Sequence, residues 1–162
     1  MMWSQVKARF ESGLADGLRG NLSVHVTSYG GLMKHGRGWL TWHGNELVSV
    51  EAPGWTMKIA NHQKMIWLVD GDTCELGAAC GYVINHSIED ALSSKNSVIA
   101  GLAMLDARCG ARRLRAVKQD ELLEFAQFAY ALRMKMLDDV CTPWICEGCG
   151  KDLLYSLSTV TR

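Results

Sequence analysis

The segment that most constrains the fold runs from Asn96 to Leu114, with the sequence NSVIAGLAMLDARCGARRL. Its first half is apolar around most of a helix circumference, which is typical of a helix buried on several sides. Asn96 or Ser97 is expected to cap the start of this helix. Gly110 is expected to follow its end as a C′ residue in the left-handed conformation. A chain with such a segment must wrap its other elements around one central helix.

A small antiparallel sheet is predicted near the N-terminus. Apolar and polar residues alternate over Leu22–Val26, which predicts a half-buried strand. Two further short strands are expected at Trp39–Trp42 and Leu47–Val50, joined by a turn at residues 43–46. Residues 21–51 are therefore interpreted as a three-stranded antiparallel meander.

Helices are predicted before and after this meander in the chain, packed on one side of the sheet. The N-terminal stretch from Met2 to Ala15 has the apolar spacing of an amphipathic helix. Ser87 with Asp90 resembles a short capping box at the start of a helix that runs to about Ser93. The last long helix is expected to open at Gln119 or Asp120 and carries an apolar stripe: Leu122, Leu123, Phe125, Ala126, Ala129, Tyr130, Leu132, Arg133, Met136 and Leu137.

Residues 52–85 have no single pattern. Met57–Leu68 fits a helix, Met65–Val69 fits a strand, and Gly77–Gly81 is a small and pliable run. The whole chain is predicted to be α+β, with an antiparallel sheet of three to four strands packed against three to four helices. One domain is expected over residues 1–140, followed by a cysteine-containing C-terminal tail over 141–162.

Composition and charge exclude several classes of protein. The hydrophobic fraction of 48% excludes a disordered chain, and 17 basic residues balance 17 acidic ones. General binding of nucleic acid normally needs a net basic surface, so it is not expected. The N-terminus lacks the pattern of a secretory signal, and no stretch approaches the roughly 20 apolar residues of a membrane span. We expect a cytoplasmic protein without membrane contact, whose six cysteines stay reduced.

The first candidate site is a group of charged residues: Asp106, Arg108, Arg112, Arg113 and Arg115. In a functional interpretation, the arginines grip an anion: a phosphate, an RNA backbone or an acidic face of a partner protein. In a structural interpretation, Asp106 and Arg113 form a clasp around Gly110 that fixes the exit of the helix. The remaining arginines are then solvated.

The second candidate site is the cysteine tail. The spacing Cys146-x-x-Cys149-Gly has the shape of a zinc knuckle, because such a turn brings two thiolates to one side. A closed structural site needs four ligands. Cys141 is a third candidate, and a fourth would have to come from this set: Cys74, Cys80 and His86. The alternative is a tail of reduced thiols, so a structural zinc is the single cofactor hypothesis.

Aromatic residues form a third candidate set. Trp39 and Trp42 have opposite parity on one predicted strand, so one of them should face away from the core side of the sheet. Tryptophan side chains anchor many protein interfaces. His25 and His43 are expected on neighbouring strands, where they could face each other. The sequence contains no nucleophile elbow, Walker loop or dinucleotide fingerprint.

The run from Leu105 to Leu114 resembles the signature Leu-Asp-x-Arg-x-Gly-x-Arg-Arg-Leu of an uncharacterised family of small bacterial proteins. Further matches to that family are Met2-Trp3, Gly36–Trp39, Phe128 and Leu132-Arg133. The resemblance implies a shared fold and supplies no reaction. Because such proteins often lie beside genes for secreted toxins, it also implies an immunity role.

The expected function is therefore binding rather than catalysis. The most specific form is an immunity protein that neutralises a cognate bacterial toxin by direct contact, and the expected contact residues are Arg108, Arg112, Arg113, Arg115, Trp39 and Trp42. The alternative is a zinc-containing, nucleic-acid-associated module that uses the arginine cluster on phosphates. No enzyme is expected, because no catalytic set of residues is recognisable.

Overall fold

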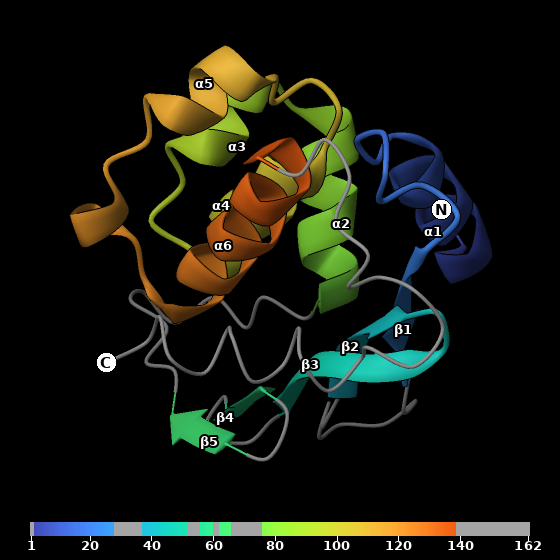
Figure 1. Cartoon of the computed structure of the whole chain (residues 1–162). Coiled ribbons are helices and arrows are strands. Elements are labelled where there is room, and N and C mark those ends of the chain that lie inside the picture. Colours follow the sequence, from blue (N-terminus) through green and yellow to red (C-terminus); the bar gives the residue numbers. More distant parts are fainter. Residues whose placement is uncertain (1, 28–36, 52–55, 60–61, 66–75, 139–162) are drawn as a thin grey trace.

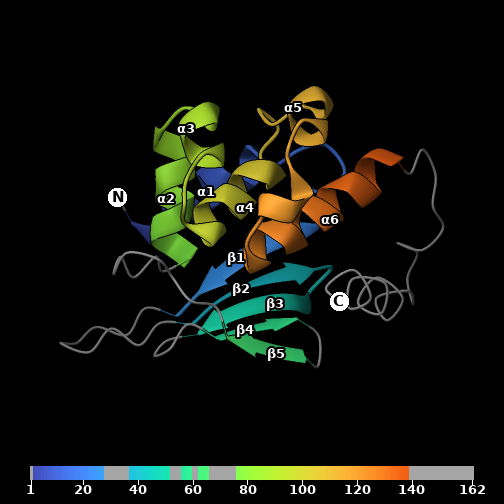
Figure 2. The ribbon, with the colours of Figure 1, turned by 90° about the vertical axis from the view of Figure 1, so that its left-hand side faces the viewer.

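The computed structural model describes residues 2–27, 37–51, 56–59, 62–65 and 76–138. Within these residues the chain has two layers, a five-stranded antiparallel sheet and a layer of helices on one side of it (Figures 1 and 2). This confirms the expected α+β class, in which an antiparallel sheet packs against helices. None of the described helices is both long enough and apolar enough to span a membrane.

The sheet is a meander in which each strand pairs with the next along the chain. Its strands are β1 (Leu22–Val26), β2 (Arg37–Trp42), β3 (Asn45–Glu51), β4 (Thr56–Ile59) and β5 (His62–Met65). The predicted meander over residues 21–51 is confirmed as β1, β2 and β3. The sheet then continues through the short β4–β5 hairpin.

That hairpin corrects the predicted helix over residues 57–68. β4 pairs with β3 in antiparallel register, with Ile59 opposite Val48 and Met57 opposite Val50. Strand β3 has backbone N–H and C=O groups along both edges. Strand β2 pairs with one edge, and the hairpin provides hydrogen-bond partners for the other. Of the alternative strand over residues 65–69, Met65 lies in β5, and residues 66–69 lie outside the described residues.

A two-residue turn joins β2 to β3. His43 and Gly44 both have positive φ, at 47° and 82°. This is the geometry of a mirror-image turn, whose twist matches that of the strands it connects. The predicted turn at residues 43–46 is therefore shorter in the structure, because Asn45 already belongs to β3.

The helical layer contains α1 (Trp3–Ser12), α2 (Leu76–Asn85), α3 (Ile88–Leu92), α4 (Ser97–Leu105), α5 (Ala111–Arg115) and α6 (Glu124–Asp138). All nine residues of α4 are buried, which confirms the predicted central helix. Its N-cap also follows the prediction: Asn96 accepts hydrogen bonds from the backbone of Val98 and Ile99. At α3, Ser87 Oγ accepts from the backbone N–H of Asp90.

Helix α2 corrects the expectation of a pliable run at residues 77–81. One face of this helix is buried, and its members recur at helical spacing: Leu76, Ala79, Cys80 and Val83. The helix begins directly above β2, where a Cβ on Gly38 would lie 2.4 Å from the Cβ of Leu76. Only glycine on the strand allows this close approach.

Two predicted helix ends also differ. Helix α4 ends at Leu105, and Gly110 has φ −67°, so it is the N-cap of α5 rather than a left-handed C′ residue. The backbone leaves the helix earlier because the Asp106 side chain binds the backbone N–H of Arg108, which favours a turn. The last helix begins at Glu124, and residues 119–121 form a separate 3₁₀ turn, η1 (Gln119–Glu121).

Candidate functional site

The predicted arginine cluster is centred on Asp106, a buried carboxylate directly after α4. Its Oδ1 accepts hydrogen bonds from the backbone N–H and the Nε of Arg108, at 2.8 and 3.0 Å. Its Oδ2 accepts from Nη2 of the same arginine at 2.9 Å. This bidentate pair raises the pKa of Arg108, with the hydrogen bond to Asp106 as the largest cause. Asp106 therefore pairs with Arg108, and not with Arg113 as predicted.

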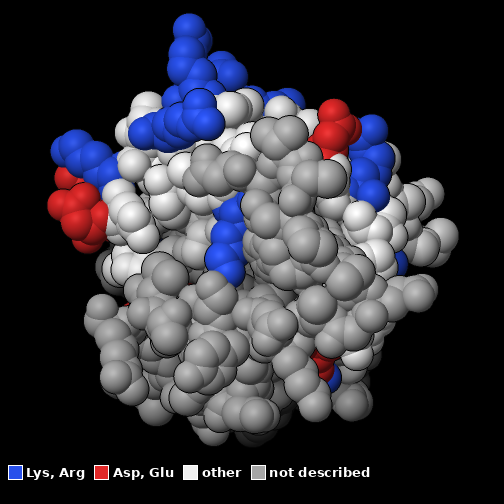
Figure 3. All heavy atoms as spheres, viewed as in Figure 1, with Lys and Arg blue, Asp and Glu red and all other residues white. Residues whose placement is uncertain are grey.

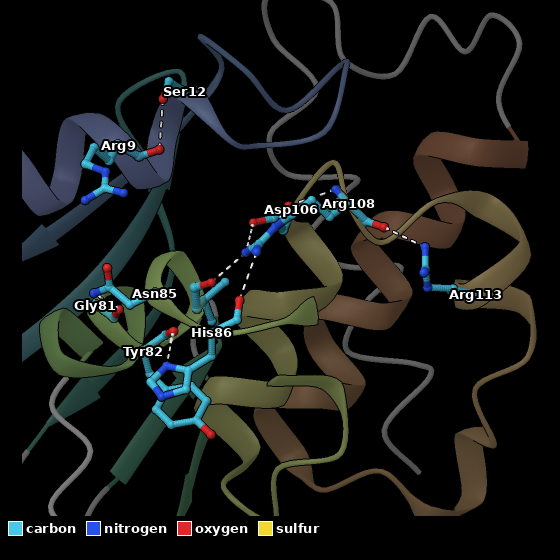
Figure 4. Close-up of polar contacts among 10 residues, drawn as sticks. Arg9, Ser12, Gly81, Tyr82, Asn85, His86, Asp106, Arg108 and Arg113 are labelled. Carbon is cyan, nitrogen blue, oxygen red and sulfur yellow. Dashed lines mark hydrogen bonds and ion pairs between the residues drawn. The ribbon is translucent and has the colours of Figure 1, made fainter. Parts of the chain in front are cut away.

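The guanidinium of Arg108 also reaches the end of α2, as Figure 4 shows. Nη2 donates to the carbonyl of Val83 at 2.5 Å, and Nη1 donates to the carbonyl of His86 at 3.0 Å. Carbonyl groups at a helix C-terminus lack partners within the helix and carry partial negative charge, so a cation there is favourable. Arg108 therefore ties the end of α2 to the segment that follows α4.

Arg133 of α6 likewise donates hydrogen bonds to backbone carbonyls at and beyond the end of α4. This buried side chain donates from Nε to the carbonyl of Met104 at 3.0 Å and from Nη2 to the carbonyl of Cys109 at 3.2 Å. The carbonyl of Leu105 accepts from the backbone N–H of Ala15 at 3.0 Å. Burial lowers the pKa of Arg133, although an arginine stays charged at any ordinary pH. The C-terminus of the central helix is thus closed by α6 and by the segment after α1.

Arg113 of α5 forms a more exposed link. Its Nη2 donates to Oε1 of Glu89 on α3 at 2.5 Å, and its Nη1 donates to the carbonyl of Arg108 at 3.2 Å. The pKa of Glu89 is lowered, first by its own backbone N–H and then by Arg113. Both side chains are about half exposed, so the pair contributes little stability and mainly orients α5 against α3.

The remaining arginines of α5 lie on the surface. Arg112 and Arg115 are exposed, whereas Leu114 is the one buried residue of this helix. Within the described part of the chain, the side chain of Arg112 takes part in no hydrogen bond or ion pair. Figure 3 shows the basic side chains gathered over α5 at the top of the molecule. The predicted arginine cluster therefore divides into Arg108, which holds the fold, and Arg112, Arg113 and Arg115, which face solvent.

The two tryptophans of β2 lie on opposite sides of the sheet. Trp42 is 6% exposed and belongs to the core, so the structure places it away from any contact surface. Trp39 is half-buried on the other face, where its ring stacks on His25 with centroids 5.1 Å apart. The guanidinium of Arg37 lies 4.7 Å from the centre of the same ring, a cation–π arrangement.

His25 therefore faces Trp39 rather than His43. The register of β1 and β2 places it directly opposite Trp39, and its Nε2 lies 3.0 Å from Oγ1 of Thr41. Burial lowers the pKa of His25, and the nearby charge of Lys7 adds to the effect. The lowered pKa favours the neutral form of this side chain, which stacks on Trp39.

The candidate metal site cannot be located on the fold. Cys141, Cys146 and Cys149, together with Cys74, lie outside the described residues. Cys80 and Cys109 are buried, and burial raises the pKa of the Cys109 thiol. Among the described residues, no three His, Cys, Asp or Glu side chains come together as metal ligands, and this includes Cys80 and His86.

The model of the SF0329 protein family matches this chain over residues 2–70 and 57–134. The chain belongs to the SF0329 protein family. This uncharacterised family match spans the elements from α1 into α6, and so includes Asp106, Arg108 and the basic helix α5. No curated protein and no solved structure matches the chain. Membership of the SF0329 family therefore brings no reaction with it.

Sequence reasoning missed the role of Arg133 in this SF0329 chain. Arg133 was predicted only as one member of the apolar stripe of the last helix, four positions after Ala129 and four before Leu137. An arginine within an apolar stripe is the available signal of a buried cation that needs acceptors. Glu89 was also missed, because its distance in sequence from α5 hides the pairing with Arg113.

Proposed function

We propose that this SF0329-family protein acts by binding an acidic surface of another protein through α5. In its most specific form, the proposal is an immunity protein that neutralises a cognate bacterial toxin by direct contact. The observation that carries it is the composition and exposure of α5. This helix has the sequence ARRLR, presents three exposed arginines and contains no acidic residue.

The surroundings of α5 favour a rigid presentation of these arginines. Leu114 anchors the helix in the core, and Arg113 binds both Glu89 and the carbonyl of Arg108. Beneath α5, Arg108 holds the ends of α2 and α4 together. A contact surface that is ordered before binding loses less conformational entropy on association, so its interactions contribute more to affinity.

An acidic protein fits this surface better than nucleic acid does. Guanidinium groups form paired hydrogen bonds with carboxylates, and a few arginines are enough to anchor a protein interface. A nucleic acid instead needs a long basic track. Here Glu89 already pairs with Arg113 of α5, and the turn η1 that follows α5 in the chain carries Asp120 and Glu121. The chain as a whole has no net charge.

The test uses the product of the gene next to the one that encodes this chain. The two proteins are co-expressed, complex formation is measured by co-purification and calorimetry, and protection is measured as growth of cells that express the neighbouring protein. Arg112→Glu should weaken the complex at least about tenfold and reduce protection, because it places a like charge against the acidic partner.

Lys95→Glu is the matched control, because Lys95 is an exposed cation outside α5. It makes the same change in net charge and should bind as the wild type does. Trp42→Ala is not a useful interface variant, because that side chain is buried. Binding that is equally strong in wild type, Arg112→Glu and the double variant Arg112→Glu/Arg115→Glu would contradict the proposed surface. Absence of a complex with the folded neighbouring protein would contradict the immunity role.

A further inference from the structure

Arg113 differs from the neighbouring arginines in the kind of partner it has. Arg108 is bound to Asp106, whose side chain is only 7% exposed, and to two backbone carbonyls. Among the described residues, the side chain of Arg112 has no hydrogen bond or ion pair. Arg113 is bound to Glu89, whose side chain is 62% exposed. A partner protein can therefore reach the carboxylate that Arg113 holds, but not the carboxylate that Arg108 holds.

The two terminal nitrogens of Arg113 bind different groups. Nη1 donates to the backbone carbonyl of Arg108 at 3.2 Å (Figure 4), and Nη2 donates to Oε1 of Glu89 at 2.5 Å. The bond to the backbone does not involve Glu89, so it can keep the guanidinium in place when Glu89 leaves. Nη2 is then available to another carboxylate, the acceptor that guanidinium groups bind most strongly.

Glu89 also has a second donor within its own helix. It is the second residue of α3, after the N-cap Ser87. Backbone N–H groups in the first turn of a helix lack partners within the helix. The backbone N–H of Glu89 is the largest cause of the lowered pKa of its own side chain, ahead of Arg113. Separation of the pair therefore leaves neither charged group without a partner, and an ion pair between exposed side chains is weak in any case.

We propose that Glu89 is an internal competitor for the acidic partner of α5: it occupies Nη2 of Arg113 in the free protein, and a carboxylate of the partner displaces it. This inference rests on the proposed function of α5 and adds how that surface is controlled. In the free protein Glu89 neutralises one of the three arginines of α5, and after the exchange all three act on the partner. An internal competitor lowers the apparent affinity in proportion to the fraction of molecules in which the pair is closed. For an exposed ion pair this reduction should be about two- to sixfold.

The first experiment measures affinity for the product of the neighbouring gene by calorimetry. Glu89→Gln keeps the size of the side chain and removes its charge. Asp90→Asn is the matched control, because it makes the same charge change at the next exposed residue, whose carboxylate accepts from Ser87 Oγ rather than from an arginine. Glu89→Gln should bind about two- to sixfold more tightly than Asp90→Asn does. Equal affinities of the two variants, or weaker binding by Glu89→Gln, would overturn the internal competitor.

A double-mutant cycle tests whether the effect passes through Arg113. In the background Arg113→Gln there is no guanidinium for Glu89 to occupy, so Glu89→Gln should then bind no more tightly than Asp90→Asn. If Glu89→Gln gains the same factor with and without Arg113, the gain comes from the general field of the surface, and the proposed exchange is wrong.

A second probe separates this inference from the proposed function. Binding of labelled poly-L-glutamate at low ionic strength is measured by fluorescence anisotropy for the same variants, and the same order of affinities is expected. If the neighbouring gene product binds no variant, the immunity role fails, and equal binding of poly-L-glutamate to Glu89→Gln and Asp90→Asn would overturn the competitor as well. If the gene product binds and Arg112→Glu weakens the complex, but Glu89→Gln equals Asp90→Asn, the role of α5 stands and only the competitor is wrong. If poly-L-glutamate binds no variant either, α5 does not recognise carboxylates and both proposals fail.

Discussion

Arg133 and Arg112 show how differently one residue type can act in a single small domain. The guanidinium of Arg133 is buried and donates to carbonyls at and beyond the end of α4. The side chain of Arg112 is exposed on α5 and, within the described residues, takes part in no hydrogen bond or ion pair. The two arginines differ because Arg133 lies beside the buried C-terminus of a helix and Arg112 does not. A helix C-terminus that is buried leaves carbonyl groups without donors, and a guanidinium can supply several at once.

The same comparison separates the fold from its surface. Arg108 and Arg133 serve the ends of α2 and α4, so changes there should appear in the free energy of unfolding. Arg112 and Arg115 face solvent, so changes there should appear in binding. Arg113 stands between the two groups, because it is exposed but paired with Glu89.

Arg133→Met should have the largest effect. It leaves the buried carbonyls of Met104 and Cys109 without their guanidinium donors, which should lower the free energy of unfolding by about 3 kcal/mol. Denaturant unfolding followed by circular dichroism measures this. Arg133→Lys keeps the charge on a shorter side chain, so it should lower the free energy of unfolding less than Arg133→Met does. Wild-type stability of Arg133→Met would show that these carbonyls do not need Arg133.

Asp106→Ala should come next. It removes the acceptor of the Arg108 backbone and guanidinium, at a cost of about 2 kcal/mol in the same unfolding measurement. Asp106→Asn is the matched control, because it keeps one oxygen acceptor, and its loss should be intermediate. If the asparagine and alanine variants are equally unstable, charge rather than the arrangement of hydrogen bonds makes this residue important.

Glu89→Gln should have a small effect that depends on pH. The pKa of Glu89 is lowered in the folded protein from its usual 4.5, first by its own backbone N–H and then by Arg113, so the charged carboxylate stabilises the fold above that pH. This contribution is lost as pH falls through the lowered pKa of the folded state. Thermal unfolding of wild type and variant should therefore differ at neutral pH and converge in acid. A difference that persists in acid would exclude the ion pair as its source.

Arg112→Glu should have the smallest effect on stability, within about 0.5 kcal/mol of wild type. The side chain is exposed and holds no other element. Unfolding in denaturant measures this, with Lys95→Glu as a control of equal charge change. A loss as large as that of Asp106→Ala would show that Arg112 belongs to the fold and would remove the distinction between the two groups of arginines.

Local signals in the sequence were sufficient for many elements of the fold. The meander over residues 21–51 and the caps at Ser87 and Asn96 are as predicted, and so is the N-terminal helix, except that it ends at Ser12 rather than at Ala15. In each case the deciding interaction lies within a few residues: an apolar spacing, an alternation, or a side chain that binds its own backbone.

Elements that depend on distant partners were not predictable. Helix α2 has small residues and no polar contrast, so it becomes a helix because its buried face packs against the rest of the core. The β4–β5 hairpin depends on the open edge of β3. Helix α4 ends at Leu105 rather than just before Gly110, because the Asp106 side chain binds the backbone N–H of Arg108. Gly110 alone predicted a later end.

The candidate site was predictable in composition but not in pairing. The sequence groups Asp106 with the arginines that follow it, and the structure confirms that this carboxylate holds one of them. Which arginine it holds depends on where α2 ends, because the carbonyls of Val83 and His86 complete the environment of Arg108. That contact joins residues more than twenty positions apart. No local pattern contains it.

The closure of α4 by Arg133 and Ala15 has a consequence for synthesis of the chain. The end of the central helix needs a donor from the N-terminal segment and another from α6. A nascent polypeptide that still holds α6 inside the ribosome can therefore form the sheet and the first helices but cannot complete its core. The domain should become resistant to protease in a single late step, once Arg133 has left the exit tunnel.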